Sequence, residues 1–304
     1  MALSTPTQPP LSAQPRFLVR TAPLLAALTL VGCPTDDGSV PDTPAGPRSG
    51  TLSVLSYNVH ALPAAIAGDD PEGRMPQIVP LLEPFDVVGL QETWTDEYYG
   101  LLTDADFPHQ LRFPEKIEDE RQYGSGLAVF SAMPQLDHHH QHFTQCNGFL
   151  DGASDCLASK GFQRVTLELA PGVQVDLWNS HFEAGGGPDD VAARLSNTEE
   201  IRAAMEAQSA GRAMIFTGDT NLHPWRDAED VEPWENLMAG GLLDSCEAVS
   251  CPEPEHIDRV LFRSGGGVTL TATAWANEPA FVDEDGEELS DHPPISATFD
   301  WSVE

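Results

Sequence analysis

The sequence predicts an α/β fold in which two β-sheets pack face to face and helices flank them. Short apolar segments rich in β-branched residues recur along the chain, and a few segments with helical spacing lie between them. Strands and helices mixed in this way favour layers packed around one core. The chain has 304 residues, 40% of them hydrophobic, and no internal repeat, so we expect one sizeable domain.

The first residues have the features of an export signal. Arg16 and Arg20 precede the apolar run 22–30, which leads through Leu-Val-Gly to Cys33. A basic flank, a short apolar run and small residues are typical of a secretory signal. A cysteine after Leu-Val-Gly resembles a bacterial lipobox, in which Cys33 would be lipidated. An ordinary signal peptide and a start codon assigned too early are the alternatives.

The chain therefore divides into three parts: a signal peptide with lipobox at residues 1–32, a lipidated cysteine with a flexible tether at 33–50, and one domain at 51–304. The tether is rich in Pro, Gly, Asp and Ser, a composition typical of flexible linkers. No run of eighteen apolar residues is present that could span a bilayer. We expect an exported bacterial lipoprotein, periplasmic or at the cell surface, held on a membrane by its N-terminal lipid.

Four cysteines remain after Cys33, and they form two close pairs in the sequence. In an oxidising compartment, Cys146–Cys156 and Cys246–Cys251 are the simplest of the three possible connectivities. Metal binding by the thiols is the alternative, but neither pair has the spacing typical of zinc sites. We therefore expect two local disulfides.

The chain is strongly acidic, with 15 basic and 48 acidic residues. Two of the basic residues, Arg16 and Arg20, precede Cys33, so the mature chain keeps 13 basic residues and has a net charge of −35. Only two lysines occur, Lys116 and Lys160. Such a surface repels polyanions and disfavours nucleic acid as a partner, although a bound metal can reverse the sign of the charge locally.

The strands and helices are predicted from local patterns. The segment at 51–58 alternates and is β-branched, and the segment at 86–90 (DVVGL) is expected to be a buried strand that ends at Gln-Glu. A short helix is expected at 76–82. The longest helical pattern, 189–210, places five side chains near one face: Val191, Leu195, Ile201, Met205 and Gln208. The other predicted strands are 126–130, 165–169, 173–178, 213–216, 260–262, 268–272 and 295–299.

Several of these segments end in, or are interrupted by, a polar side chain suited to catalysis. Side chains at the ends of neighbouring strands meet at one rim of a sheet, where folds of this kind place function. We expect these residues to share one site. They are Asn58, Glu92, His181, Asp219, Asn221, Asp258, Asp291 and His292.

The order of the motifs around these residues resembles that of the endonuclease/exonuclease/phosphatase superfamily, which includes pancreatic-type deoxyribonucleases, inositol polyphosphate 5-phosphatases and bacterial sphingomyelinases. The motifs LSYN, GLQE, SGL, NSH, GDTN, IDR and SDH follow one another, and the resemblance extends over about residues 53–299. It implies the four-layer, DNase I-like form of the sandwich and phosphoryl chemistry. Substrates differ widely within the superfamily, so the resemblance alone does not select one.

Glu92, Asn58 and Asp291 are the predicted metal ligands. Hydrolysis of a phosphate ester needs a hard cation to neutralise the charge that develops on oxygen. Glu92 offers a carboxylate at the end of a buried strand, and such oxygen ligands suit Mg²⁺ or Mn²⁺. Asn58 would offer its amide oxygen to the same ion or orient Glu92. Asp291 resembles the superfamily's additional acid on the metal side, or an acid that orients the base.

The predicted catalytic groups are two histidines and three polar residues. His292 would act as the general base because imidazole titrates near neutrality, and the resemblance places Asp258 beside it. His181 resembles the histidine that contacts the phosphate or protonates the leaving group. Asp219 and Asn221 would position the attacking water and a phosphate oxygen, and Asp219 is the alternative base.

The segments DCLASKGF and HFEAGGG resemble bacterial sphingomyelinases and related exported lipoproteins. Lys160 in the first segment would contact a phosphodiester, or would be a solvated turn lysine. We therefore predict a monomeric phosphodiesterase acting on a phospholipid headgroup. An exported endonuclease is the alternative enzyme, and a catalytically inactive surface binding module is the alternative of another class. The complete set of acid, amide and histidine residues argues against the inactive module.

Overall fold

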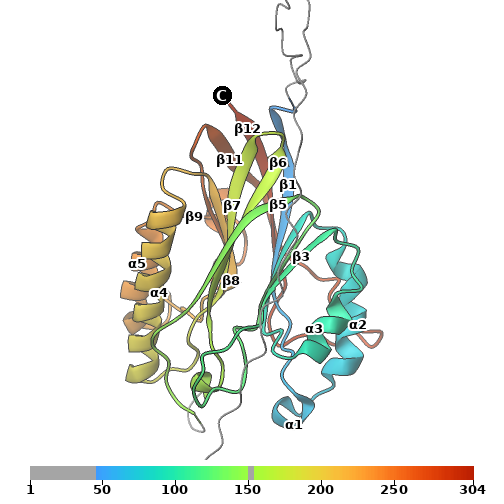
Figure 1. Ribbon diagram of the computed structural model, residues 1–304, viewed down its shortest axis with the longest axis vertical. Helices are drawn as coiled ribbons and strands as arrows, with labels where there is room; N and C mark the ends of the chain where they lie inside the picture. The colour runs from blue at the N-terminus through green and yellow to red at the C-terminus, as the bar shows by residue number, and fades with distance from the viewer. Residues whose placement is uncertain (1–45, 150–153) are drawn as a thin grey trace, which may run out of the picture. The chain divides into compact units, whose positions relative to one another are not determined.

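A computed structural model describes residues 46–149 and 154–304, which contain two six-stranded sheets (Figure 1). The first sheet consists of β1 (Ser49–Asn58), β2 (Val87–Gln91), β3 (His109–Phe113), β4 (Leu127–Ser131), β11 (Val268–Asn277) and β12 (Ile295–Val303). Its strand order is β11-β12-β1-β2-β4-β3. The second sheet consists of β5 (Gln135–His142), β6 (Gly161–Ala170), β7 (Val173–His181), β8 (Met214–Asp219), β9 (Leu243–Asp244) and β10 (Asp258–Arg263). Its strand order is β5-β6-β7-β8-β10-β9.

Helices cover the outer face of each sheet (Figure 1). α2 (Pro71–Leu82) and α3 (Asp96–Leu102) pack on the first sheet, and α4 (Pro188–Gln208) and α5 (Val231–Met238) pack on the second. The layers are therefore helix, sheet, sheet and helix. This arrangement confirms the predicted two-sheet sandwich with flanking helices in its four-layer form.

The central strands bury both of their faces. In β1, Leu52 and Val54 belong to the core between the two sheets, whereas Leu55 and Tyr57 pack with the side chains of α2 and α3. Strands covered on both faces have nearly continuous apolar sequences. This explains why the strands of the sheet centres are recognisable in the sequence.

Strand direction brings the polar strand ends to one rim. β1 and β2 are parallel and end with Asn58 opposite Gln91, and β7 and β8 are parallel and end with His181 opposite Asp219. β10 is antiparallel to β8 and begins at Asp258, opposite Asp219. β12 is antiparallel to β1, so the segment that precedes it also lies at this rim. In Figure 1 the rim is the lower end of the strands, near α1 (Ala64–Ala67).

The sequence patterns missed the elements that are short or polar. β3 and β5 lie at sheet edges and carry many polar side chains, so neither has the apolar run that marks a central strand. β9 has only two residues. The helices α1, α3, α5 and α6 (Ser245–Val249) have between four and eight residues, too few to show a clear helical period.

The buried face of α4 differs from the predicted one. Ile201 and Met205 are buried as expected, but Val191 and Leu195 are only partly covered. In the first half of the helix the buried face is largely polar: Asp190, Arg194, Asn197 and Thr198 are buried there, beside Ala193. Arg194 bonds to Asp230 at 3.0 Å and to carbonyl groups that follow His181. This half of α4 therefore packs on a hydrogen-bonded network rather than on apolar side chains.

Both predicted disulfides are present, Cys146–Cys156 and Cys246–Cys251. The predicted signal, Cys33 and most of the tether lie outside the described residues, and these predictions are untested. In residues 46–149 and 154–304, no helix combines the length and the apolar character that crossing a membrane requires.

Candidate active site

A cleft of about 220 Å³ opens at the rim where the strand ends meet. Side chains from both sheets line it, so the site depends on how the sheets pack against each other. The lining includes six of the residues predicted from the sequence: Glu92, Lys160, His181, Asp219, Asn221 and His292. Apolar and aromatic side chains complete it, among them Leu62, Ile66, Trp94, Tyr123 and Leu157.

Asn58 joins two carboxylates across the site. Its Nδ2 atom donates to Glu92 Oε1 at 2.9 Å and to Asp219 Oδ2 at 3.1 Å. Its Oδ1 atom accepts the backbone N–H of His60 at 3.0 Å. The amide group therefore faces the two carboxylates with its nitrogen, and its oxygen is held by the backbone of His60.

Glu92 is held in an unusual backbone conformation. Its φ of 62° lies in the left-handed region, which a non-glycine residue rarely occupies. Its Oε2 atom accepts a hydrogen bond from the indole N–H of Trp94 at 3.2 Å. Strained backbone of this kind persists where the surroundings impose it, often at functional sites.

Asp258 and His292 form the expected pair. The Nδ1 atom of His292 lies 3.0 Å from Asp258 Oδ2 and 3.7 Å from Asp219 Oδ2. Burial lowers the pKa of His292, but the hydrogen bond and charge of Asp258, with Asp219 and Asp291, outweigh it and raise this pKa to about 10. Burial and the charge of Asp258 raise the pKa of Asp219 to about 6. Burial also raises the pKa of Asp258.

His181 is buried between Lys160 and Asp219. Its Nε2 atom lies 3.1 Å from Lys160 Nζ and 3.4 Å from Asp219 Oδ2. Burial, followed by the positive charge of Lys160, lowers the pKa of His181 well below its usual value. The imidazole is therefore neutral. Its Nδ1 atom is buried and has no hydrogen-bond partner among the described residues.

Asn221 turns the chain sharply after β8. Its φ is 49°, its backbone N–H donates to Asp219 Oδ1 at 3.0 Å, and its side chain donates to the Phe182 carbonyl at 3.2 Å. The turn therefore fixes the Asp219 carboxylate and ties the ends of β7 and β8 together.

Asp291 lies at the outer edge of the site. Its side chain is 58% exposed, and its Oδ1 atom lies 3.1 Å from His60 Nδ1. His60 Nδ1 is also 3.7 Å from Glu92 Oε2. The His60 imidazole thus lies between the carboxylates of Asp291 and Glu92, and the role of Asp291 as a metal ligand stays a prediction.

The donor atoms fit a divalent cation. Among the described residues, one oxygen each of Glu92 and Asp219 and one nitrogen of His292 lie within 4.8 Å of one another. Asp258 and Asp291 add negative charge nearby. Burial, and after it the charge of neighbouring carboxylates, raises the pKa values of Asp219 and Asp258. The carboxylates therefore repel one another. A bound cation would relieve that repulsion.

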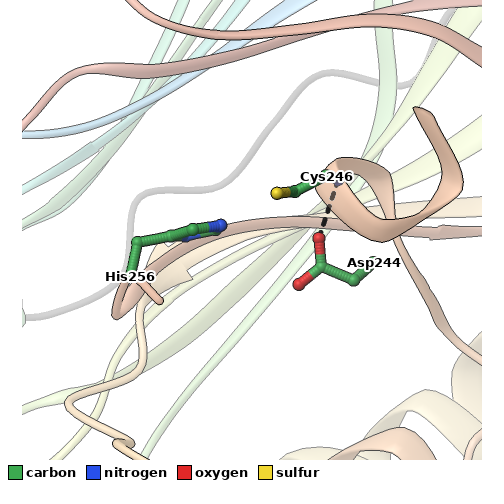
Figure 2. A group of neighbouring side chains, drawn as sticks. All are labelled: Asp244, Cys246 and His256. Carbon is green, nitrogen blue, oxygen red and sulfur yellow. Dashed lines mark hydrogen bonds between the residues drawn. The ribbon is translucent and has the colours of Figure 1, made fainter. Parts of the chain in front are cut away.

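A second group of possible ligands lies apart from the cleft. Asp244, Cys246 and His256 point toward one another near α6 (Figure 2). Cys246 is bonded to Cys251, so its sulfur is not a thiolate. Asp244 pairs with Arg259 at 2.6 Å and accepts the backbone N–H of Cys246 at 2.8 Å. We interpret this group as support for the loop that leads to Asp258.

Sequence reasoning missed four side chains that shape the site. His60 stands two residues after Asn58, and Trp94 two residues after Glu92, so proximity to a motif was an available signal. The ring of Trp94 lies 5.9 Å from that of His181. Asp155 and Glu183 surround Lys160. They stand in the segments DCLASKGF and HFEAGGG, so these segments were the available signal.

Asn179 explains why the motif before His181 begins with asparagine. Its Nδ2 atom donates to the carbonyl groups of Leu90 and Ala128 in the first sheet, at 2.9 and 3.0 Å. Its Oδ1 atom accepts from Gln91 Nε2 at 2.7 Å. One side chain of the second sheet thus bonds to two strands of the first and sets the spacing of the sheets below the cleft.

Comparisons with known proteins agree with this geometry. The model of the Endonuclease/Exonuclease/phosphatase family matches residues 55–292. A sphingomyelinase of Mycobacterium bovis is 29% identical over 288 residues, which cover 86% of this chain and 55% of that protein. The chain thus spans about half the length of the curated relatives it matches first.

Two solved structures have a similar fold. Sphingomyelinase C from Streptomyces griseocarneus has a TM-score of 0.60 at 22% identity, with 82% of this chain and 99% of that one covered. Beta toxin from Staphylococcus aureus, in a mutant form with bound magnesium ions, has a TM-score of 0.59 at 17% identity, with coverages of 82% and 99%. The family match spans most of the chain and includes the motifs that meet at the cleft. The chain belongs to the Endonuclease/Exonuclease/phosphatase family.

Proposed function

We propose that this protein is a divalent-metal-dependent phosphodiesterase. The main supporting observation is that Glu92 and Asp219, whose carboxylates could hold a cation, line one cleft together with His292, which Asp258 holds by a hydrogen bond. Hydrolysis of a phosphate ester requires both a hard cation and a group that accepts the proton of the attacking water. Family membership supports the same chemistry.

Glu92 would hold Mg²⁺ or Mn²⁺, with Asp291 as a further predicted ligand. Asn58, predicted either to bind the ion or to orient Glu92, would take the second role, because its nitrogen faces the carboxylates. When bound, the ion supplies positive charge where the phosphoryl oxygens become more negative. Asn58 keeps Glu92 and Asp219 at a fixed separation through its two hydrogen bonds. The magnesium ions of the structurally similar beta toxin support the choice of ion.

His292 and Asp219 are the two candidates for the base. Asp258 accepts from His292 Nδ1, which leaves Nε2 as the nitrogen that can take a proton from water. With a pKa of about 10, His292 is protonated at neutral pH as long as no cation neutralises the carboxylates around it. Neutralising those carboxylates lowers this pKa toward the range in which imidazole accepts a proton. Asp219, with a pKa of about 6, is the alternative.

His181 and Lys160 would bind the phosphoryl group. Because the pKa of His181 is strongly lowered, this imidazole is neutral and acts as a hydrogen-bonding group rather than as the acid that protonates the leaving group. Lys160 is one of two lysines in the chain, and it lies in the wall of the cleft. It is buried rather than solvated, which favours a site role over that of a turn lysine.

We propose a zwitterionic phospholipid headgroup, as in sphingomyelin, for the substrate. Two of the similar proteins are sphingomyelinases, which supports this choice. A headgroup without net charge is also not repelled by an acidic surface. An exported endonuclease is the alternative, and an inactive binding module is the alternative of another class. Activity on any phosphodiester would exclude the inactive module.

A substrate panel tests the proposal. The purified domain would be assayed with Mg²⁺ on sphingomyelin vesicles, phosphatidylcholine vesicles, plasmid DNA, inositol phosphates and a bis-aryl phosphate. We expect release of phosphocholine and slower cleavage of the bis-aryl ester. Cleavage of DNA without release of phosphocholine would favour the nuclease, and no turnover of any substrate would contradict the enzyme assignment.

A further inference from the structure

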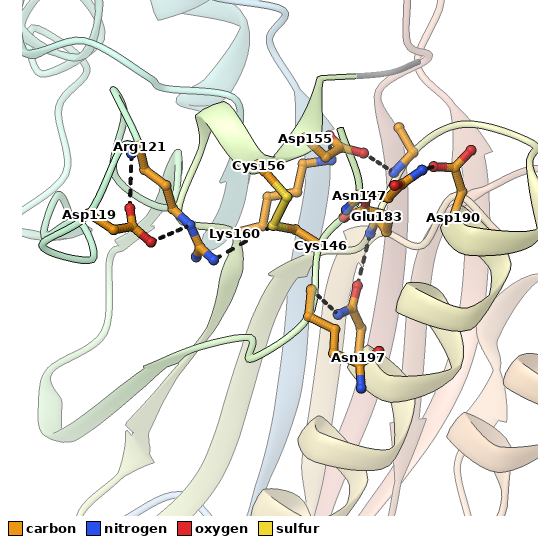
Figure 3. Close-up of a disulfide and its surroundings, with 12 residues drawn as sticks. Asp119, Arg121, Cys146, Asn147, Asp155, Cys156, Lys160, Glu183, Asp190 and Asn197 are labelled. Atoms are coloured by element: carbon orange, nitrogen blue, oxygen red, sulfur yellow. Dashed lines mark hydrogen bonds and ion pairs between the residues drawn. A yellow bond between two sulfur atoms is a disulfide. The ribbon is translucent and has the colours of Figure 1, made fainter. Parts of the chain in front are cut away.

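The Cys146–Cys156 disulfide lies beside the cleft, and residues next to both of its cysteines bond to the segment that carries His181 (Figure 3). Its Cα atoms are 5.3 Å apart. Asn147 follows the first cysteine and Asp155 precedes the second. We call these two residues, together with the disulfide, the bridge clamp.

On one side of the bridge clamp, Asp155 holds Lys160. The Oδ1 atom of Asp155 lies 2.6 Å from Lys160 Nζ, and its other oxygen accepts the backbone N–H of Ala184. Both Asp155 and Lys160 are buried. Asp155 thus contacts the lysine and the backbone just after His181.

On the other side of the bridge clamp, Asn147 holds Glu183. The backbone N–H of Asn147 donates to Glu183 Oε1, and its side chain donates to Asp190 Oδ1 at 2.6 Å, in the first turn of α4. Glu183 is only 1% exposed. Figure 3 shows Asn147 between the disulfide and the side chains of Glu183 and Asp190.

Lys160 connects Asp155 to His181. Its ammonium group contacts His181 Nε2 at 3.1 Å and donates to the Phe182 carbonyl at 2.9 Å. Within the described residues, Asp155 is the single carboxylate that lies within 4 Å of the ammonium. A buried ammonium that loses its carboxylate partner is strongly disfavoured, so release of Asp155 would move Lys160 toward solvent.

We propose that the Cys146–Cys156 disulfide is a positioning element of the active site, which holds Lys160 and His181 for the phosphoryl group through Asp155 and Asn147. The inference rests on the proposed function, because that function assigns the two side chains to the phosphate. A dithiol that reduces the bridge transfers two electrons and two protons to its sulfur atoms and itself becomes a disulfide. The two halves of the bridge clamp then separate, and the lysine loses its fixed position.

Amine labelling tests the clamp without using activity. The chain has two lysines, of which Lys116 is exposed and serves as an internal standard. Reductive methylation followed by mass spectrometry should modify Lys116 and spare Lys160 in the oxidised protein. In a Cys146→Ser, Cys156→Ser variant, labelling of Lys160 should become faster by about tenfold or more, since local opening now exposes it. The matched control, Cys246→Ser with Cys251→Ser, removes the other disulfide and should leave Lys160 protected.

Kinetics on a bis-aryl phosphate test the consequence for the site. We expect the Cys146→Ser, Cys156→Ser variant to lose about tenfold or more in kcat/KM, mainly through a higher KM, because a phosphate contact is lost. Treating the Cys246→Ser, Cys251→Ser protein with a dithiol should reproduce both effects, and reoxidation should reverse them. Reduction and reoxidation of this protein test the proposal even if the Cys146→Ser, Cys156→Ser variant does not fold.

The outcomes separate this inference from the proposed function. Protection of Lys160 with unchanged KM and kcat, after the bridge is removed or reduced, would overturn the inference even if the enzyme is a phosphodiesterase. Exposure of Lys160 in a protein that hydrolyses no phosphodiester would support the clamp and overturn the proposed function.

Discussion

The imidazole of His292 lies near three carboxylates, and their combined charge decides its protonation state. Asp258 bonds to it directly, while Asp219 and Asp291 act through space, and the pKa rises to about 10. His181, on the other side of Asp219, has its pKa shifted in the opposite direction by burial and by Lys160. Two histidines a few ångströms from the same carboxylate are therefore set to different charges, which suits them to different roles.

Within the Asp258–His292 pair, removal of the imidazole should cost more activity than removal of the Asp258 charge. We expect His292→Ala to lower kcat by roughly 10²- to 10⁴-fold, and Asp258→Asn by less, because the amide still holds the ring. The two residues act as a unit, so the double variant should resemble His292→Ala alone. Steady-state kinetics of the four proteins measure this. Additive losses would mean that Asp258 only supports the fold.

Glu92 is expected to be indispensable for cation binding. Glu92→Gln keeps the shape of the side chain but removes the negative charge, and a neutral amide binds Mg²⁺ far less well. We expect turnover to disappear while the melting temperature stays close to that of the wild type. Titration calorimetry with Mg²⁺ should show weaker binding. Normal turnover of the Glu92→Gln variant at saturating Mg²⁺ would contradict the role of Glu92 as a ligand of the ion.

Glu183 should make stability depend on pH. Burial, with the charge of Asp155, raises its pKa from 4.5 to about 8. A carboxyl whose pKa is raised on folding stabilises the native state fully below about 4.5, and this contribution is lost as pH rises through about 8. The expected slope is at most on the order of 1 kcal/mol per pH unit within that window.

The isosteric variant Glu183→Gln isolates this effect. Free energies of unfolding from urea titrations should be similar for both proteins at pH 5, whereas the variant should be the more stable one at pH 8.5. A difference that does not change with pH would show that Glu183 ionises normally in the folded protein.

At the scale of the elements, the close approach of β2 and β8 governs the shape of the site. Gly89 in β2 faces Thr217 in β8, and a Cβ atom on Gly89 would stand 2.1 Å from Thr217 Oγ1 and 3.0 Å from Asn179 Oδ1. All three residues are buried. The glycine therefore lets the sheets approach closely enough for Asn179 to bond to Leu90 and Ala128.

A methyl group at Gly89 should separate the sheets locally. We expect Gly89→Ala to destabilise the fold by about 1–3 kcal/mol, because buried side chains must shift to admit it. The matched control is Gly100→Ala in α3, where a Cβ atom meets nothing within 4 Å. That change should stabilise the protein by about 0.5–1 kcal/mol, since alanine favours helix. Urea unfolding of both variants measures the difference, and equal effects would contradict the close-packing interpretation.

Across the whole molecule, the few positively charged side chains bind to acceptors within the protein itself. Among the described residues, each arginine side chain bonds to a carboxylate or carbonyl group of the chain itself, as Arg164 does to Asp137 and Asp176, and Arg259 to Asp244. Lys160 pairs with Asp155. Few cations thus remain to contact a nucleic-acid backbone, and a net charge of −33 for the whole chain repels one.

Salt dependence should therefore distinguish the two candidate substrates. Hydrolysis of sphingomyelin should change little with ionic strength, because the headgroup carries no net charge. Any nuclease activity should be weak at low salt and improve as ions screen charges beyond roughly 10 Å at 0.1 M. Rates between low salt and 0.3 M NaCl would be compared. Tight DNA binding at low salt that weakens steeply with added salt would contradict the lipid substrate.

The fold class, the central strands, α4 and the polar residues at the strand ends could all be predicted from the amino-acid sequence. Apolar runs and helical spacing are local, so they survive in a single sequence, and a polar residue at the end of an apolar run marks a strand end. Both disulfides could also be predicted from the sequence, because the paired cysteines lie only 10 and 5 residues apart.

The packing of the two sheets decides the contacts that these residues make with one another. Asn58 and Asp219 are 161 residues apart, and they meet only because parallel strands in two packed sheets end at the same rim. His60, Trp94, Asp155 and Glu183 stand in or near recognised motifs, but their roles follow from contacts that exist only in the folded chain. The opposite pKa shifts of His181 and His292 have the same origin, since burial and neighbouring charges exist only once the sheets have packed.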